Sequence, residues 1–238
     1  MYDYRAGKKR VAEILDNIPK IEDSPKIPGD GGFTFENAHY GWVTAIFVDI
    51  RNSTGLFASE NKEEVSKIVR SFTSEIIEIL RGSDNERSIG IRGDSVFAIY
   101  TTSSQQDIND CVTRAVYVNT FLKMLNKLLD KKSYGNIQAG IGISTDKELV
   151  IKAGRINTGI NDKIWIGKAV TGASNLSSLG NKRWVDSIVI SPVTYTNLKD
   201  VNLNTASIFK CAQDYSYYHG NVVDTAFNKW IDEGMPNW

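Results

Sequence analysis

The stretch that decides the fold is residues 41–57, GWVTAIFVDIRNSTGLF. Its first part, through Val48, is rich in β-branched and aromatic residues, as is typical of a strand buried in a core. The apolar run ends on Asp49, and the polar stretch 51–55 follows at once. A strand-end aspartate often only caps a turn. It can also present a metal ligand or a reacting group, because the strand that carries it is rigid.

The sequence after this stretch alternates between helical and strand periodicity. The pattern predicts an α+β fold in the order β-α-β-β-α-β, which is the ferredoxin-like split βαβ with two helices on one face of the sheet. The expected strands and helices, in chain order, are 42–49, 62–81 (helix), 87–92, 95–100, 105–130 (helix), 136–144 and 148–153, the last two paired across a turn at 145–147. A helix at 168–179, a strand at 185–190 and a short helix at 192–198 are expected to follow.

Three segments are expected along the chain. Residues 1–40 hold a short amphipathic helix over 1–18 and then an irregular stretch that contains several Pro and Gly residues. Residues 41–215 form the main domain, and residues 216–238 form a C-terminal extension that packs on it. Further strands are expected between residue 200 and the tail.

The composition argues against several classes of protein. Lys plus Arg and Asp plus Glu both number 28, so no excess of positive charge favours nucleic acid or a membrane surface as a partner. The two cysteines lie in no metal-binding spacing, and no apolar stretch approaches the roughly 18 residues of a membrane span. We therefore expect a cytoplasmic protein that binds neither nucleic acid nor a membrane.

A second carboxylate, Asp94, lies in the tight turn of the strand pair GIRGDSVFAIY. In a split βαβ sheet the first strand lies beside this pair, so Asp49 and Asp94 are expected to converge. Two carboxylates are hard oxygen ligands that suit Mg²⁺ or Mn²⁺ together with phosphate oxygens. An aspartate after a glycine is by itself an ordinary hairpin turn, so only the joint arrangement favours a site.

The turn after the first strand could cradle phosphates. A polar turn between a strand and a helix offers free backbone N–H groups and hydroxyls. The same residues could instead form an ordinary helix N-cap. The candidate phosphate-binding residues are Asn52, Ser53, Thr54, Gly55, Leu56 and Phe57.

Four motifs together resemble the catalytic domain of class III nucleotidyl cyclases, over roughly residues 41–215. VTAIFVDIRNSTGLF is similar to that family's metal strand and phosphate-binding turn, and IGIRGDSVFAIY to its hairpin with a second metal aspartate. IQAGIGIS followed by ELVIKAG resembles its central strand pair. WIGKAVTGASNLSSLG followed by VDSIVIS resembles its late helix and strand.

The resemblance implies a chemistry and an assembly. Asp49 and Asp94, with the main-chain carbonyl of Ile50, would hold two Mn²⁺ or Mg²⁺ ions at each active site. The ribose 3′-hydroxyl of a nucleoside triphosphate would attack the α-phosphate, giving a 3′,5′-cyclic nucleotide and pyrophosphate. The family also implies a homodimer with composite active sites.

Several positions depart from the family's purine-specific pattern. Gly90 stands where purine cyclases carry a base-reading lysine, and Ile164 where they carry a base-reading aspartate. Thr171 and Asn175 stand where the late helix carries its asparagine and arginine. Lys168 and Arg92 are among the residues that could supply the missing positive charge.

These departures, with both aspartates kept, resemble the bacterial pyrimidine cyclases of antiphage defence. That likeness implies UTP, or CTP as the second choice, as the substrate and a cyclic nucleotide that activates a separately encoded effector. A purine cyclase with rearranged base contacts and a non-catalytic nucleotide-binding homologue are the alternatives. A diguanylate-cyclase-like domain would share the split βαβ core, but Arg92–Ser95 is not the loop of that group.

Overall fold

The computed structural model describes residues 1–53, 55 and 61–236. Two long strands form its centre, β2 (Asn37–Ile50) and β5 (Ala139–Gly154). The other strands are β1 (Lys20–Asp23), β3 (Glu86–Arg92), β4 (Ser95–Thr101), β6 (Asn161–Gly167), β7 (Ile188–Ile190), β8 (Lys210–Cys211) and β9 (Tyr218–Gly220). The helices are α1 (Tyr4–Asp16), α3 (Lys62–Leu80), α4 (Gln105–Asp130), α5 (Ala169–Leu179), α6 (Pro192–Val201), α7 (Leu203–Ala206) and α8 (Thr225–Asp232), with a 3-10 turn, η1, at Asp30–Gly32.

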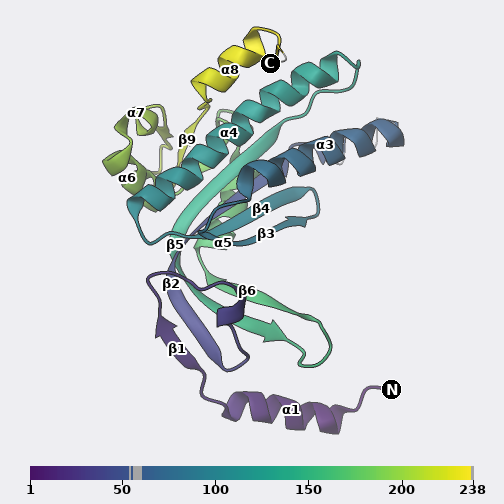
Figure 1. Ribbon diagram of the computed structural model, residues 1–238, viewed down its shortest axis with the longest axis vertical. Coiled ribbons are helices and arrows are strands. Elements are labelled where there is room, and N and C mark those ends of the chain that lie inside the picture. Colours follow the sequence, from purple (N-terminus) through teal and green to yellow (C-terminus); the bar gives the residue numbers. More distant parts are fainter. Residues whose placement is uncertain (54, 56–60, 237–238) are drawn as a thin grey trace.

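The strands form one sheet in the order β3-β4-β2-β5-β7-β9-β8, with β1 added to β2 and β6 to β5 (Figure 1). β2 is antiparallel to both β4 and β5, while β5 and β7 are parallel. The two long helices start where their sequence dictates. Asn61 caps α3 with Glu63 in its first turn, and Ser104 forms a capping box with Asp107 at the start of α4. The expected α+β class is confirmed.

The inner half of the β2–β5 pair, residues 43–50 of β2 and 139–146 of β5, is covered on both faces. On one face Ile46, Val48 and Ile50 pack with buried residues of α3 and α4, which form the main core. On the other face Val43, Ala45 and Phe47 pack against α5 and against Ile27 and Phe33, which precede β2 in the chain. The alternation of side chains along a strand accounts for this division.

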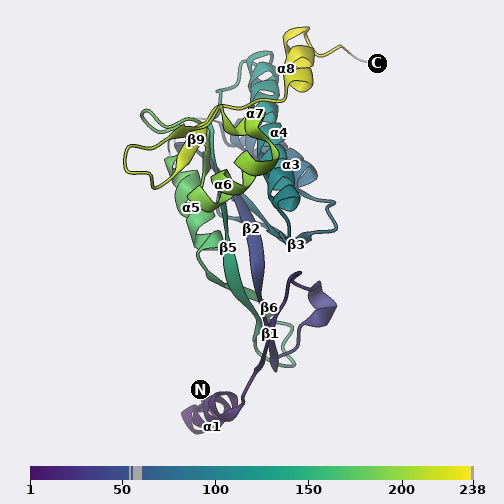
Figure 2. The same ribbon diagram turned by 90° about the vertical axis from the view of Figure 1, so that its left-hand side faces the viewer.

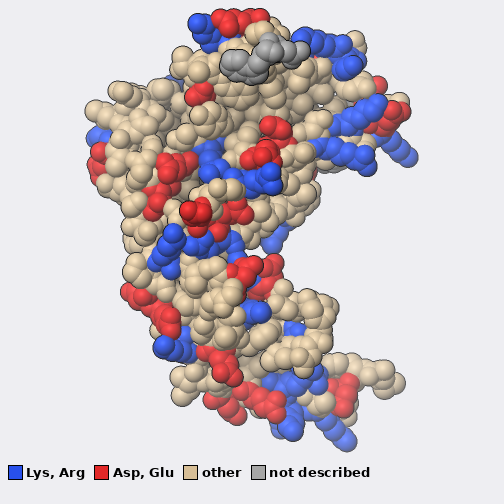
Figure 3. Space-filling model, in the orientation of Figure 1, with Lys and Arg blue, Asp and Glu red and all other residues tan. Residues whose placement is uncertain are grey.

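The outer half of the pair projects from this body as an arm, with β1 and β6 on its two sides and α1 at its far end (Figures 1 and 2). One face of the arm carries half-exposed apolar side chains, with Lys147 over the ring of Tyr40. Its half-exposed residues are Tyr40, Trp42, Ile164 and Ile166. Lys and Arg are interspersed with Asp and Glu over the side of the molecule shown in Figure 3.

Several expectations about elements were wrong. The turn expected at 145–147 does not exist, because β5 runs straight through it and Thr145 and Asp146 pair with Thr44 and Val43 of β2. The partner of the outer part of β5 is instead β6. The stretch 19–40 is not wholly irregular, since it holds β1, η1 and the start of β2. The C-terminal extension contains α8, which is joined to α4 by hydrogen bonds. Within the described ranges, no helix has the length and hydropathy to cross a bilayer.

Candidate functional site

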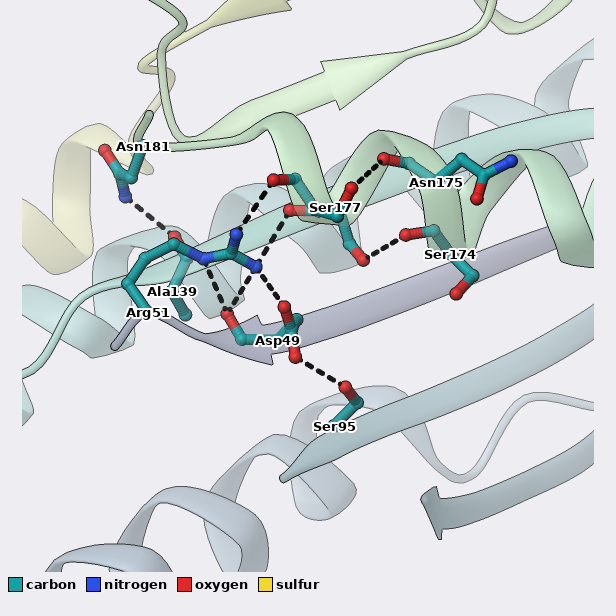
Figure 4. A network of polar contacts seen from close by, with 9 residues as sticks. Asp49, Arg51, Ser95, Ala139, Ser174, Asn175, Ser177 and Asn181 are labelled. Carbon is teal, nitrogen blue, oxygen red and sulfur yellow. Dashed lines mark hydrogen bonds and ion pairs between the residues drawn. The ribbon is translucent and has the colours of Figure 1, made fainter. Parts of the chain in front are cut away.

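Asp49 is the centre of a polar network at the inner end of β2 (Figure 4). Its Oδ1 accepts a hydrogen bond of 2.7 Å from the Ser95 hydroxyl, and its Oδ2 forms an ion pair with the guanidinium of Arg51. The Asp49 side chain is 24% exposed and that of Arg51 is 9% exposed. The carboxylate is thus oriented on both oxygens and still reaches solvent.

Asp94 adjoins this network through the sheet register. β2 and β4 pair so that Asp49 lies opposite Ser95, the residue directly after Asp94. The turn joining β3 to β4 consists of Gly93 and Asp94, and Gly93 has φ +62°, a conformation that favours glycine. The hairpin therefore holds the half-buried Asp94 beside the inner end of β2.

Arg51 joins Asp49 to α5, and sequence reasoning gave it no role. Besides the Asp49 carboxylate, its guanidinium donates to the carbonyl oxygens of Ser177 (3.0 Å) and Ser178 (2.9 Å), in the last turn of α5, and to that of Asp49 (3.1 Å). A basic residue two positions after a strand-end aspartate was the only sequence signal. Its partners on α5 lie more than a hundred residues further along the chain.

The close approach of α5 to the sheet depends on glycines in β5. A Cβ atom at Gly142 would overlap the backbone of Ala173 and Ser177, and one at Gly140 would overlap the carbonyl of Ser177. Any larger residue would therefore push the helix away from the strand. Gly140 lies opposite Asp49 in the register, so the same contact brings α5 to the aspartate.

The other end of α5 is held by Glu148, which sequence reasoning also missed. Its Oε1 accepts hydrogen bonds from the backbone N–H groups of Ala169 (2.6 Å) and Val170 (3.3 Å), the first residues of the helix. The residue is fully buried, and its Oε2 has no hydrogen-bond partner among the described residues. Burial raises the pKa of the Glu148 carboxyl above its ordinary value, while the two helix N–H groups oppose that rise.

The expected phosphate-binding turn is described only in part. Asn52 has φ +53°, and Ser53 follows it. The Asn52 side-chain amide lies where a Cβ at Gly55 would point. Thr54, Leu56 and Phe57 lie outside the described residues. The role of the turn stays a prediction.

The candidates for base or transition-state contacts are spread over three elements. Gly90 lies on β3, and a Cβ there would lie 3.0 Å from ring carbons of Phe97, which stacks on Phe47. Ile164 is 44% exposed on β6 in the arm, and the register places it in line with Ala38, at the opposite end of β2 from Asp49. Arg92, at the end of β3 next to the Gly93–Asp94 turn, is exposed.

The remaining candidates lie on or next to α5. Lys168 precedes the helix and is exposed. Thr171 donates its hydroxyl to the carbonyl of Gly167, and Asn175 is exposed one turn further along, near the Arg51 end of the helix (Figure 4).

The donor set at the inner end of β2 fits a hard divalent cation. Asp49, Asp94 and the main-chain carbonyl of Ile50 supply only oxygen. The described part of the chain holds no group of three or more His, Cys, Asp or Glu side chains arranged for a metal. A site with two carboxylates leaves positions for water or phosphate oxygens, as Mg²⁺ requires. The residues therefore fit a metal ion shared with a phosphate ligand.

The chain is similar in sequence to known nucleotide cyclases. The sequence model of the adenylate and guanylate cyclase catalytic domain matches residues 35–220. A uridylate cyclase of Treponema porcinum is 52% identical over 235 residues, covering 98% of this chain and 82% of that protein. A uridylate cyclase of Gulbenkiania mobilis is 28% identical, covering 98% of this chain and 96% of that protein.

Solved structures show the same fold at low identity. An adenylyl cyclase of P. aeruginosa superposes with a TM-score of 0.63 at 22% identity, over 79% of this chain and 96% of that one. A class III adenylyl cyclase-like ATP-binding protein of Pseudomonas aeruginosa gives 0.66 at 14% identity, over 96% of this chain and 49% of that one. The chain belongs to the adenylate and guanylate cyclase catalytic domain family.

Proposed function

We propose that this protein is a uridylate cyclase, which converts UTP to 3′,5′-cyclic UMP and pyrophosphate. The observation that carries the proposal is the identity of 52% to a uridylate cyclase over 98% of the chain. The strand-end aspartate and the hairpin aspartate beside it support the chemistry. CTP is the second choice of substrate.

Asp49, Asp94 and the carbonyl of Ile50 would hold two Mn²⁺ or Mg²⁺ ions. When bound, these ions lower the pKa of the ribose 3′-hydroxyl and neutralise charge on the triphosphate. Ser95 and Arg51 orient the Asp49 carboxylate from both oxygens. Asn52, Ser53 and Gly55, with Thr54, Leu56 and Phe57, are proposed to bind the phosphates. Thr171, Asn175, Lys168 and Arg92 are the proposed sources of contacts to the ribose or to the developing charge.

The altered base-reading positions support a pyrimidine. At Gly90 the ring of Phe97 lies close to the space that a longer side chain would need, so a lysine there would have to displace the ring. Ile164 offers no hydrogen-bonding side chain. A pocket without the purine-reading pair would leave the polar edge of a purine unpaired, which disfavours that base.

The arm supports a homodimer with composite active sites. Four half-exposed apolar residues, Tyr40, Trp42, Ile164 and Ile166, share one face of its sheet, and clustered apolar residues of this kind are used in protein interfaces. A second copy of this chain is the proposed occupant. The cyclic nucleotide is proposed to act as a second messenger in antiphage defence, through an effector encoded separately.

The test is a competition among the four nucleoside triphosphates. The purified protein is incubated with Mn²⁺ and equal amounts of ATP, GTP, CTP and UTP, and the products are identified by mass spectrometry. Cyclic UMP is expected. Cyclic AMP or cyclic GMP as the main product would overturn the choice of base, and the absence of any cyclic product, with nucleotide binding seen by calorimetry, would favour a non-catalytic binding protein.

Two variants test the carboxylates, with a third as a matched control. Asp49→Asn and Asp94→Asn are each expected to lower kcat by about a thousandfold or more, equivalent to about 4 kcal/mol of transition-state stabilisation. Asp130→Asn changes an exposed aspartate at the end of α4 and is expected to act like the parent protein. Near-normal activity in both site variants would contradict the proposed metal site.

A further inference from the structure

Helix α5 is held at its two ends by side chains of opposite charge. Glu148 of β5 accepts from the N–H groups of Ala169 and Val170 at the N-terminal end. Arg51 donates to the carbonyls of Ser177 and Ser178 at the C-terminal end. The backbone dipoles of a helix favour an acidic group at its start and a basic group at its end. The two contacts therefore fix the helix along its axis.

Arg51 differs from Glu148 because it is shared between two groups. One planar guanidinium bonds the Asp49 carboxylate and the carbonyls at the end of α5 together (Figure 4). Its side chain is 9% exposed, so little water is available to replace either partner. A charge-assisted bond in such a setting is among the stronger hydrogen bonds in a protein.

The residues around this contact allow the C-terminal end of α5 little movement. The backbone of α5 around Ser177 rests directly on Gly140 and Gly142, and the Asn181 amide donates to the carbonyl of Ala139 at 2.7 Å just after the helix. Packed interiors change between discrete arrangements more readily than they deform. A change in the contact between Arg51 and Asp49 therefore alters the packing of the end of α5.

We propose that Arg51 is a positioning residue that couples the binding of a divalent cation at Asp49 to the position of α5. A cation on Asp49 competes with the guanidinium for the same carboxylate. The bond from Arg51 to Oδ2 weakens, and the guanidinium is left to the partly negative carbonyls of Ser177 and Ser178. Cation binding thus tightens the last turn of α5. The inference rests on the proposed function in that it places the metal at Asp49.

The test measures amide hydrogen exchange in residues 176–182 with and without Mn²⁺, in the absence of nucleotide. In the parent protein Mn²⁺ is expected to slow exchange in the last turn of α5 by at least threefold. In Arg51→Met the response is expected to fall below 1.5-fold. A residue that merely capped the helix would change the exchange rate without metal and leave the response to Mn²⁺ as it was.

Arg114→Met is the matched control. Arg114 also donates its guanidinium to two backbone carbonyls, those of Ile79 (2.6 Å) and Arg81 (3.1 Å), but its carbonyl partners lie at the end of α3. It is expected to keep the full response to Mn²⁺. If Arg51→Met does not fold, Arg51→Lys decides. One guanidinium nitrogen bonds Ser178 while the other bonds Asp49 and Ser177, and the single nitrogen of an ammonium cannot occupy both places, so this variant should also lose the response.

The inference is overturned if the parent protein shows no response to Mn²⁺, or if the variant of Arg51 that folds keeps it. It fails separately from the proposed function. Cyclic UMP formation without a response to Mn²⁺ in α5 would overturn only the coupling through Arg51. The response without any cyclic product would overturn only the proposed reaction.

Discussion

The inner and outer halves of the β2–β5 pair are built from the same two strands and differ in what covers them. In the inner half Ile46 and Val48 are completely buried beneath α3 and α4. In the outer half Trp42 of β2 is 40% exposed, and Ile166 of β6, on the far side of β5, is 49% exposed. The inner half carries the stability of the fold and the strand-end aspartate. The outer half keeps an apolar face free, which the proposed homodimer would use.

The largest effect on stability is expected in the inner half. Ile46→Ala would leave a cavity under α3 and α4 and should lower the free energy of unfolding by about 3 kcal/mol. Urea denaturation followed by circular dichroism measures the change. A loss below about 1 kcal/mol would mean that the inner half is no better packed than the arm.

A close second is expected where the inner half meets α5. Gly142→Ala places a methyl group against the backbone of Ala173 and Ser177, so the helix must move. We expect a loss of about 2 kcal/mol in the free energy of unfolding and a fall in kcat. Gly31→Ala is the matched control, because nothing lies within 4 Å of a Cβ at that position in the N-terminal segment. Equal effects of the two substitutions would contradict the close approach of α5.

Glu148 lies on β5 near the boundary between the two halves, and it makes the free energy of unfolding depend on pH. Its folded-state pKa is raised above the ordinary 4.5, so the folded protein binds this proton more tightly than the unfolded chain. The stabilisation is complete below pH 4.5 and is lost as pH rises through the folded-state pKa. Glu148→Gln should remove this part of the pH dependence and change the free energy of unfolding by about 1 kcal/mol.

Denaturation of the parent and of Glu148→Gln at several pH values measures this effect. The variant is expected to gain stability relative to the parent as pH rises. A constant difference between the two proteins across the pH range would show that Glu148 has the same pKa in both states.

The smallest effect on the fold is expected on the bare face of the arm. Ile166→Ala removes atoms that are already half in water, so the free energy of unfolding of a single chain should fall by less than about 1 kcal/mol. The same variant should weaken the proposed homodimer, which sedimentation velocity at several protein concentrations measures. If the variant assembles like the parent protein, this face is not part of the interface.

Much of the body was predictable because its signals are local. The amphipathic periodicity of α3 and α4 and their caps lie within each segment, and both helices were expected within a residue or two of where they occur. The Gly93–Asp94 turn is equally local, because a hairpin of two residues needs a glycine-like conformation. The topology then brought Asp94 next to the strand of Asp49.

The continuous β5 was not predictable from its own residues. Thr145, Asp146 and Lys147 have turn-like composition, yet β2 pairs with each of them and Lys147 lies over the ring of Tyr40. Pairing between distant strands overrides local preference. The roles of Arg51 and Glu148 were not predictable from the sequence for the same reason, because both depend on where the ends of α5 lie in the fold.

The continuous strand β2 also fixes the distance between Trp42 and Asp49. Trp42 and Asp49 are carried by the same strand, and each residue advances the chain by about 3.3 Å. Whatever surface covers Trp42 is therefore kept at a set spacing, roughly 23 Å by that rise, from the aspartate. Adding a single residue between them would lengthen the spacing slightly, but it would turn Asp49 to the opposite side of the sheet, away from α5.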